Sequence, residues 1–323
     1  MNFDFLCRSD HRVGMGHLVR CRLLAEEVLA RGGSARIHLM DPPEPLCRQL
    51  EGHRIPTAEW RGAFATEHGI LVTDLGHEPL PRGLLPFADG RRHLARIGPA
   101  AAAEGGERWL IDTNPRARPE TVDFAGPTYL PIPSAIRDLR PEQTTAPTFD
   151  RRLLITFGGS DPHHLTRSIV EAITTQDINW AEVCIVLGPL FPDPEGFKTW
   201  AFQRLGTRLE LHVATSDMPA LLASCDLAIA STGLTWFELA CLGKPTLVVA
   251  GSEHEVATAQ RLKASGHAYV LGEGETGALR AGQWLADPQR EEEQLAACQK
   301  AAFELVDGRG AQRLIDALWQ SAP

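Results

Sequence analysis

Three glycine-containing turns stand where a strand-like run is followed by a helix, and turns of this kind can bind anions. Their sequences are GMGH at residues 14–17, GGS at 158–160 and STGLT at 231–235. Free backbone N–H groups and the positive end of the helix dipole attract phosphate at such a turn. One such turn is weak evidence, because every α/β protein has tight βα loops, whereas three in corresponding places favour a phosphate-containing ligand.

The turns do not follow the common nucleotide patterns. None reads GxGxxG or GxxxxGK[ST], which disfavours NAD enzymes and P-loop kinases. The seven Cys occur singly, without CxxC spacing, and no pair of His or Asp has the spacing of metal ligands. We therefore expect reduced, mostly buried thiols, no metal site and no cofactor.

The elements that must position these turns alternate between strand-like and helical patterns. In the first half a buried strand is expected at 3–7 and a helix over 17–31, which Gly32 and Gly33 end. The strand-like runs ARIHLM, GILVTD and RWLID follow. This order is typical of an open parallel sheet.

The second half repeats the pattern after a polar, Pro-containing segment over 136–150, which is interpreted as a linker. A strand at 153–157 leads into the second turn, with Asp161 as N-cap and Pro162 at the first helical position. Further strands are expected at 183–187, 209–213, 226–230 and 246–250, and helices at 217–224 and 234–242.

Together these patterns predict an α/β protein with two doubly wound, Rossmann-like domains. They are expected over 1–140 and 150–323, with the last helix free to cross back to the first domain. Ligands bind such sheets at the carboxyl ends of the strands, so the domains are expected to face each other across a ligand cleft.

Composition narrows the classes of partner. The 323 residues suffice for two hydrophobic cores. The formal net charge of −9 gives no broad attraction for polyanions, so nucleic acid is not an expected partner. The sequence has no signal-peptide pattern and no apolar run long enough to cross a membrane, which makes the cytoplasm the default compartment. It leaves the oligomeric state open.

Three segments carry a specific resemblance. GMGHLVRC, LLITFGGSDPHHLT and DMPALLASCDLAIASTGLTWFELACLGKP resemble the UDP-sugar hydrolase of pseudaminic acid biosynthesis and its spore-coat polysaccharide relatives. They are also similar to the peptidoglycan enzyme that adds N-acetylglucosamine to a lipid-linked acceptor. The resemblance covers much of the second domain and the first turn of the first domain. It implies the two-domain glycosyltransferase B fold and a small-molecule nucleotide-sugar substrate.

The resemblance also implies roles for the matching residues. His17 matches the family's catalytic histidine, Glu238 matches the carboxylate that binds the ribose hydroxyls, and Val213 lies in the segment that matches the base-reading loop. The remaining implied contacts are Gly14 and Gly16 on the sugar and phosphate side, and Gly233, Leu234 and Thr235 at the diphosphate. The turns themselves add Gly158, Gly159, Ser160 and Thr232 as candidate phosphate contacts.

Elementary chemistry agrees with these roles. Backbone N–H groups can neutralise the charge that grows on the β-phosphate of UDP, so departure of UDP needs no metal. The attacking water or hydroxyl needs a base, and His is the side chain best suited near neutrality. His17 is the candidate, and the alternative is a neutral His that binds substrate or caps the helix. Glu238, one turn into its helix, is either a ligand contact or a solvent-facing Glu, and Trp236 is interpreted as core packing.

Two segments depart from the family. Its usual Asn-Gln pair is replaced here by GSEHE at 251–255, so Glu253 and His254 are candidate substrate contacts. Its usual Tyr is missing after ILVTD, which makes Asp74 and His77 candidate contacts in the first domain. His163 and His164 are expected at the surface.

The sequence therefore predicts a hydrolase that releases UDP from a UDP-linked amino or deoxy sugar by attack of water at the anomeric carbon. One alternative is an inverting glycosyltransferase, in which an acceptor hydroxyl replaces water at the same donor site. Another is a module that binds a nucleotide sugar without turning it over.

Overall fold

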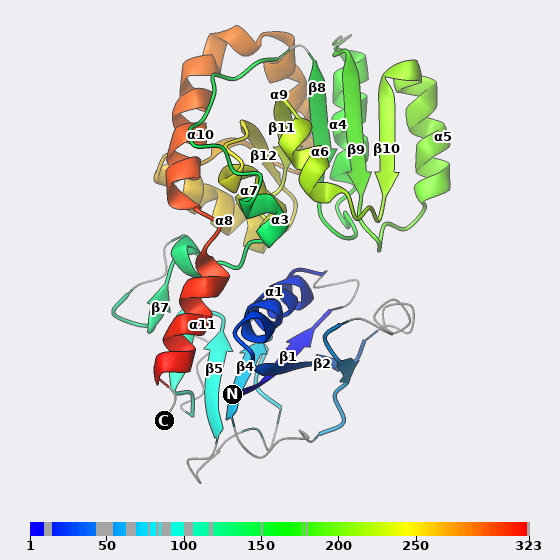
Figure 1. The fold of residues 1–323 in the computed structure, drawn as a ribbon. Helices are drawn as coiled ribbons and strands as arrows, with labels where there is room; N and C mark the ends of the chain where they lie inside the picture. The colour runs from blue at the N-terminus through cyan, green and yellow to red at the C-terminus, as the bar shows by residue number, and fades with distance from the viewer. Residues whose placement is uncertain are drawn as a thin grey trace. The chain divides into compact units, whose positions relative to one another are not determined.

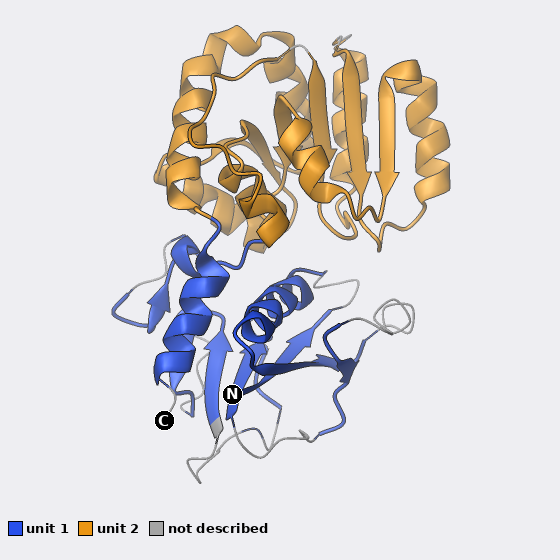
Figure 2. Cartoon of the chain, viewed as in Figure 1, with its two compact units in different colours: residues 1–132, 308–323 blue, residues 133–307 orange. Residues whose placement is uncertain are grey.

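The computed structural model divides the chain into two compact units (Figure 2). Unit 1 comprises residues 1–132 and 308–323, and unit 2 comprises residues 133–307. The chain passes from one unit to the other between residues 132 and 133 and between residues 307 and 308. The sequence patterns predicted domains over 1–140 and 150–323. The structure describes residues 1–9, 15–42, 54–62, 69–76, 78–81, 84, 92–99, 106–115, 119–149, 151–176, 178 and 180–321.

Unit 1 is built on a parallel sheet with the strand order β3-β2-β1-β4-β5-β6-β7 (Figure 1). Its strands are β1 (Asn2–Arg8), β2 (Ser34–Met40), β3 (Thr57–Glu59), β4 (Gly69–Asp74), β5 (Arg92–Ile97), β6 (Trp109–Asp112) and β7 (Phe124–Ala125). Its helical segments are α1 (Gly16–Ala30), the 3-10 turn η2 (Pro127–Tyr129) and the carboxy-terminal α11 (Gly310–Ser321).

Helices α1 and α11 contact each other, and their apolar faces share one core with the sheet. Phe5 of β1, Val28 of α1 and Leu314 of α11 are fully buried in it. Gly310, at the start of α11, lies so close to Leu130 that a Cβ atom would stand 2.0 Å from the Leu130 carbonyl oxygen. Glycine is therefore required where the returning chain joins unit 1.

Unit 2 contains a second parallel sheet, with the order β10-β9-β8-β11-β12-β13. Its strands are β8 (Arg152–Thr156), β9 (Glu182–Leu187), β10 (Leu209–Val213), β11 (Leu227–Ala230), β12 (Thr246–Ala250) and β13 (Tyr269–Glu273). Its helices are α3 (Ser134–Arg137), α4 (Leu165–Thr175), α5 (Pro194–Leu205), α6 (Met218–Ser224), α7 (Leu234–Cys241), α8 (Glu253–Ala264), α9 (Gly274–Ala286) and α10 (Glu292–Leu305), with 3-10 turns η3 (Gly206–Arg208) and η4 (Pro288–Glu291).

Alternate residues of the buried strands face opposite sides of this sheet. Leu153, Ile155 and their neighbours pack with α4, α5 and α9 in the larger core of the unit. Helices α6 and α7 contact the sheet at β8, β11 and β12. In both sheets the first strand lies between the second and the fourth, which is the doubly wound order. The expectation of two Rossmann-like domains is thus confirmed.

The start of α4 differs from its expected form. Asp161 and Pro162 lie ahead of the helix, which begins at Leu165, because Asp161 and His164 have left-handed backbone conformations with φ of 43° and 53°. The Asp161 carboxylate still accepts hydrogen bonds from the backbone N–H groups of Leu165 and Thr166, both at 2.9 Å. It therefore caps the helix from four residues upstream, without being the adjacent N-cap residue.

The segment interpreted as a linker is hydrogen-bonded to unit 2. It begins within α3, and the guanidinium of Arg140 then donates to the carbonyl oxygens of Cys241, Phe303 and Val306 at 2.7–2.9 Å. Arg140 also stacks on the Phe303 ring, 3.4 Å from its centroid. The polar composition therefore correctly indicated a connecting segment. This segment is held in place by hydrogen bonds to unit 2.

Among the described residues, no helix combines the length and the apolar character that crossing a bilayer requires.

Candidate active site

Each sheet has one point where the strand order reverses, and several of the candidate residues lie next to it. In unit 1 this switch point lies between β1 and β4, and in unit 2 between β8 and β11. Loops at the carboxyl ends of the two flanking strands form the binding crevice in sheets of this topology. His17 and Asp74 follow the flanking strands of unit 1, and the turns at 158–160 and 231–235 follow those of unit 2.

His17 and Asp74 are hydrogen-bonded across the switch point of unit 1. The Nδ1 atom of His17, in the first turn of α1, lies 2.6 Å from Oδ1 of Asp74, the last residue of β4. An ionised carboxylate can only accept, so the proton of this bond belongs to Nδ1. Within the described residues Nε2 has no hydrogen-bond partner, so this nitrogen keeps its lone pair for a proton.

Asp74 is also held by Arg20, a residue that the sequence analysis did not single out. Arg20 donates from Nε to Oδ2 at 2.7 Å and from Nη2 to Oδ1 at 2.9 Å. Burial by itself raises the pKa of the Asp74 carboxyl, but the charges and hydrogen bonds of Arg20 and His17 outweigh it and hold that pKa well below its usual range. The side chain is 1% exposed. Asp74, expected as a substrate contact, is thus buried and hydrogen-bonded to His17 and Arg20.

Gly76 completes this site two residues after β4. Its φ of +60° is in the left-handed region, and a Cβ atom there would stand 3.4 Å from Cε1 and 3.7 Å from Nε2 of His17. Glycine thus leaves room beside the imidazole. Two residues that the sequence singled out, Gly14 and His77, lie outside the described residues. Gly16, the other glycine of that turn, is the first residue of α1.

In unit 2 the turn before α7 offers backbone donors. Gly233 is the N-cap of α7 and is exposed, while Leu234 and Thr235 are half-buried. The buried Thr232 donates from Oγ1 to the carbonyl oxygen of Glu255 at 3.0 Å, which ties the turn to the start of α8. The first N–H groups of a helix have no partner within it, so this turn can bind an anion.

Glu238 is buried one turn into α7. It is 8% exposed, and this burial raises the pKa of its carboxyl to about 7. Within the described residues no hydrogen bond or ion pair reaches the carboxylate. A buried carboxylate without a donor costs free energy, which a hydroxyl-bearing ligand could recover. Glu238 is therefore not the solvent-facing residue that the sequence left as an alternative. Trp236 is buried against Phe237, as core packing predicts.

The other predicted residues of unit 2 have different environments. In the turn after β8, Gly158 has a φ of +74°, and Gly159 and Ser160 are half-buried. Gly188, after β9, packs so closely on this turn that a Cβ atom would stand 2.4 Å from the Gly158 carbonyl oxygen. Val213 ends the edge strand β10 and is 43% exposed.

Glu253 and His254 are exposed residues in the first turn of α8, and His163 and His164 are exposed, as expected. Glu255 of this segment, which the sequence analysis did not name, caps α8. Its carboxylate accepts from the backbone N–H groups of Gly251 and Ser252, at 2.8 and 3.0 Å, in a capping box. The spacing Ser-x-x-Glu at 252–255 signals this cap in the sequence.

One group of possible metal ligands exists among the described residues. Cys184, Glu210 and His212 bring one ligand atom each within 4.8 Å of one another on β9 and β10. Arg152 forms an ion pair with Glu210, and His212 Nε2 lies 2.6 Å from the same carboxylate. Burial raises the pKa of the Cys184 thiol to about 11. Arg152 and His212 therefore already provide hydrogen-bond donors to the Glu210 carboxylate.

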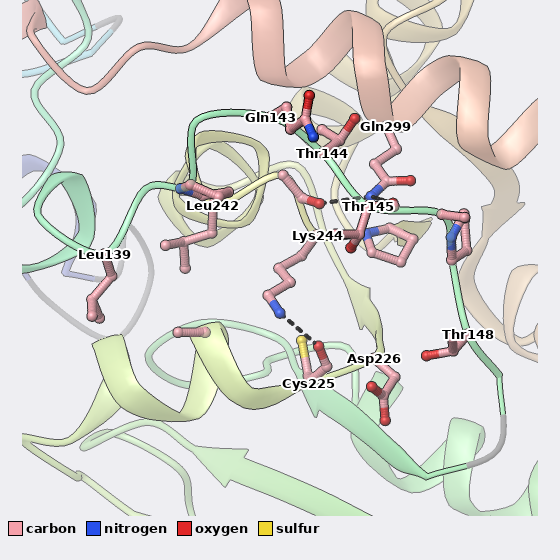
Figure 3. A pocket seen from close by; sticks show the side chains of 16 residues that line it. Leu139, Gln143, Thr144, Thr145, Thr148, Cys225, Asp226, Leu242, Lys244 and Gln299 are labelled. Carbon is pink, nitrogen blue, oxygen red and sulfur yellow. Dashed lines mark hydrogen bonds between the residues drawn. The ribbon is translucent and has the colours of Figure 1, made fainter.

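A cavity of about 290 Å³ lies in unit 2 beneath the segment that joins α3 to β8 (Figure 3). Lys244 donates from Nζ to the Cys225 carbonyl at 3.0 Å, and Gln299 donates to the Gly243 carbonyl at 2.7 Å. Cys225 precedes β11 and Lys244 precedes β12. The cavity is therefore at the amino ends of these strands, away from the glycine turns at their carboxyl ends.

The chain is similar to proteins of carbohydrate biosynthesis, although no protein-family model matches it. It is 31% identical over 153 residues to the spore coat polysaccharide biosynthesis protein SpsG of Bacillus subtilis, covering 47% of this chain and 44% of that protein. It is 25% identical over 233 residues, 70% of this chain, to a Brucella abortus transferase. That enzyme is the UDP-N-acetylglucosamine–N-acetylmuramyl-(pentapeptide) pyrophosphoryl-undecaprenol N-acetylglucosamine transferase, and 60% of it is covered. The matches thus span less than two thirds of either relative.

Among solved structures, the chain is similar to MurG of Acinetobacter baumannii, with a TM-score of 0.64 and 13% identity. The match covers 99% of this chain and 100% of MurG. Identity at this level carries the fold only. With two parallel, doubly wound units matched over nearly its whole length, the chain has the fold of the glycosyltransferase B superfamily.

Proposed function

We propose that the protein transfers a sugar from a UDP-sugar to a hydroxyl group of an acceptor, with inversion at the anomeric carbon. A named transferase similar over 70% of the chain supports transfer, and its name specifies UDP-N-acetylglucosamine as donor. The hydrolysis expected from the motifs is the same reaction with water as acceptor. None of the three similar proteins above bears the name of a hydrolase, so transfer is the better supported form.

The observation that carries the proposal is the His17–Asp74 pair. A neutral imidazole that donates Nδ1–H to a buried carboxylate is fixed in one tautomer, with Nε2 as the basic nitrogen. A base held in this way removes a proton from an attacking hydroxyl, and the carboxylate stabilises the imidazolium that results. A binding module would have no need of this arrangement.

The bond changes balance as a single displacement. The acceptor oxygen bonds to the anomeric carbon as its proton passes to Nε2 of His17. The bond from that carbon to the β-phosphate oxygen breaks, and the electron pair leaves with UDP. Attack opposite the leaving group inverts the anomeric configuration.

Unit 2 supplies the nucleotide-binding part of the proposal. The free N–H groups at the start of α7 stabilise the charge that develops on the diphosphate. Glu238 accepts hydrogen bonds from the ribose hydroxyls, which gives its buried carboxylate the donors that it lacks. The turn at 158–160 is a further candidate for the phosphate or sugar.

UDP release tests this function. Purified protein is incubated with a panel of UDP-sugars, with and without hydroxyl-bearing sugar acceptors, and both UDP and the glycoside product are measured. We expect acceptors to raise the rate of UDP release and to appear in the product, with His17→Asn as the inactive control. Equal release without acceptors, with free sugar as product, would identify a hydrolase. Tight UDP binding without any release would identify a binding module.

A further inference from the structure

Arg20 adds a guanidinium to the His17–Asp74 pair. It follows His17 by three residues on α1, so the two side chains lie on the same face of the helix. Two of its nitrogens donate to the two oxygens of Asp74. One of these nitrogens, Nη2, also lies 2.8 Å from Nδ1 of His17, a contact that is not a hydrogen bond because both nitrogens donate to Asp74. Each pair among the imidazole, the carboxylate and the guanidinium is therefore in direct contact.

Few other titratable groups are described beside these three side chains. Among the described residues, the further titratable groups packed at this site are the buried thiols of Cys7 on β1 and Cys21 on α1. A hydrogen bond from Cys7, and burial, hold the pKa of Cys21 well above its usual range, so this thiol is neutral. The segment between β1 and α1, with Asp10, His11 and Arg12, lies outside the described residues.

We propose that Arg20 is a positioning residue, which fixes Asp74 against His17 and keeps the imidazole neutral until it receives the acceptor proton. The proposal rests on the proposed function in one respect, since it takes His17 as the base. It assigns Arg20 no contact with the reacting atoms.

The opposing charges around Nδ1 give the physical reason. A buried carboxylate alone favours the imidazolium, because the opposite charge is close and poorly solvated. A protonated His17 could not act as a base. The guanidinium, with Nη2 2.8 Å from Nδ1, disfavours the imidazolium, and its two hydrogen bonds hold the carboxylate beside the imidazole. With Arg20 in place, Asp74 still orients the His17 imidazole, and the guanidinium offsets the tendency of the carboxylate to favour the imidazolium.

Two variants separate charge from geometry. In Arg20→Gln the cation is lost, so the titration midpoint of the His17 imidazole should move to higher pH by at least about one unit. In Arg20→Lys the charge remains but the two-pronged contact does not, so the midpoint should stay near the wild-type value. Both variants should lower kcat, by roughly 10-fold or more, and leave KM nearly unchanged.

The midpoint is followed by NMR of histidine-labelled protein, and the His17 signal is assigned by its loss in His17→Asn. Arg22→Gln is the matched control, because Arg22 lies on the same helix and pairs with the exposed Glu26 at 3.4 Å. It should leave the midpoint and kcat unchanged. Thermal unfolding shows which variants are folded. If Arg20→Gln does not fold, kcat of Arg20→Lys still tests the positioning role.

An unchanged midpoint in folded Arg20→Gln would overturn the role in protonation, and wild-type kcat in Arg20→Lys would overturn the role in positioning. A raised KM with unchanged kcat would make Arg20 a substrate contact instead. The NMR titration needs no turnover, so it tests Arg20 even if the protein releases no UDP. Failure of UDP release would count against the proposed function alone.

Discussion

The two units share the order of their first six strands, but different kinds of residue lie at their switch points. In unit 1 the switch point carries His17, Asp74 and Arg20, three charged or titratable side chains within hydrogen-bonding distance of one another. In unit 2 it carries glycine turns, the start of α7 and the lone buried carboxylate of Glu238. One topology thus supports two kinds of chemistry, because the strand ends are fixed while the residues after them vary.

The difference suggests a division of labour. A network of fixed charges suits proton removal, which needs one tautomer and one orientation. Backbone donors and a carboxylate that lacks donors suit a ligand with phosphates and hydroxyls. If this division is correct, substitutions in unit 1 should change the rate of the chemical step, and substitutions in unit 2 should change nucleotide affinity.

The largest expected effect follows from loss of the imidazole. His17→Asn or His17→Phe should lower kcat by roughly 10²- to 10⁴-fold, the usual contribution of a positioned base. Because the base must be unprotonated, kcat/KM of the wild type should fall on the acidic side, and the variant should lose that limb. Steady-state kinetics across pH checks both. A variant that turns over at nearly the wild-type rate would remove His17 from the mechanism.

Glu238 is expected to have the next largest effect, on affinity. Glu238→Ala should weaken UDP binding by about 1.5 to 3 kcal/mol, since a hydrogen bond to a charged acceptor is lost. Calorimetric titration measures this, with the exposed Glu171→Ala on α4 as control. Unchanged UDP affinity would exclude Glu238 from the nucleotide site.

Glu238 also gives the unliganded protein a characteristic pH dependence. Burial raises the pKa of this carboxyl to about 7 in the folded state, so the folded state binds the proton more tightly than the unfolded chain. The contribution of Glu238 to the free energy of unfolding should therefore fall as pH rises from about 4.5 to 7. Denaturant unfolding should show this fall in the wild type, and Glu238→Gln should lack it.

Gly76 should have a smaller effect. Gly76→Ala places a side chain in the left-handed region and against the His17 ring, so unfolding should become easier by about 1 kcal/mol and kcat should fall several-fold. Gly32→Ala is the control, because Gly32 has a similar φ of +78° and no neighbour within 4 Å of the added Cβ. Equal losses of activity in the two variants would mean that Gly76 does not shape the site.

The smallest expected effect is that of metal removal. Backbone N–H groups at α7 meet the diphosphate in this account, so UDP release should survive EDTA with little change. Activity that is abolished by EDTA and restored by magnesium would contradict leaving-group stabilisation by unit 2 alone.

Much of the scaffold could be predicted from the sequence, because buried parallel strands have continuous apolar runs. The predicted bounds of the buried strands β4 and β12 agree with the structure, and so do those of the half-buried edge strand β10. Strand β5 was not predicted, since RHLARI contains two arginines. One of them, Arg96, is 2% exposed and donates to the Glu78 carbonyl at 2.6 Å. Periodicity cannot show that a charged residue is buried when its partner lies far along the chain.

The same limit applies to the candidate site. His17 was indicated by the resemblance of its turn to the family's motif, and Asp74 by its place at a strand end. Arg20 was not, because nothing in the pattern of α1 says that this arginine meets a carboxylate 54 residues away. Glu238 was implied by the family resemblance and agreed with its spacing along α7, but its burial depends on the packing of α7 in unit 2.

The most direct test of the division of labour compares His17→Asn and Glu238→Ala in the same two assays, kcat for UDP release and the Kd of UDP. The account predicts reciprocal results. His17→Asn should lower kcat by roughly 10²-fold or more and leave Kd unchanged, whereas Glu238→Ala should raise Kd by roughly 10-fold or more. The two units would not divide chemistry and binding as proposed if His17→Asn weakened UDP binding as much as Glu238→Ala does, with kcat retained.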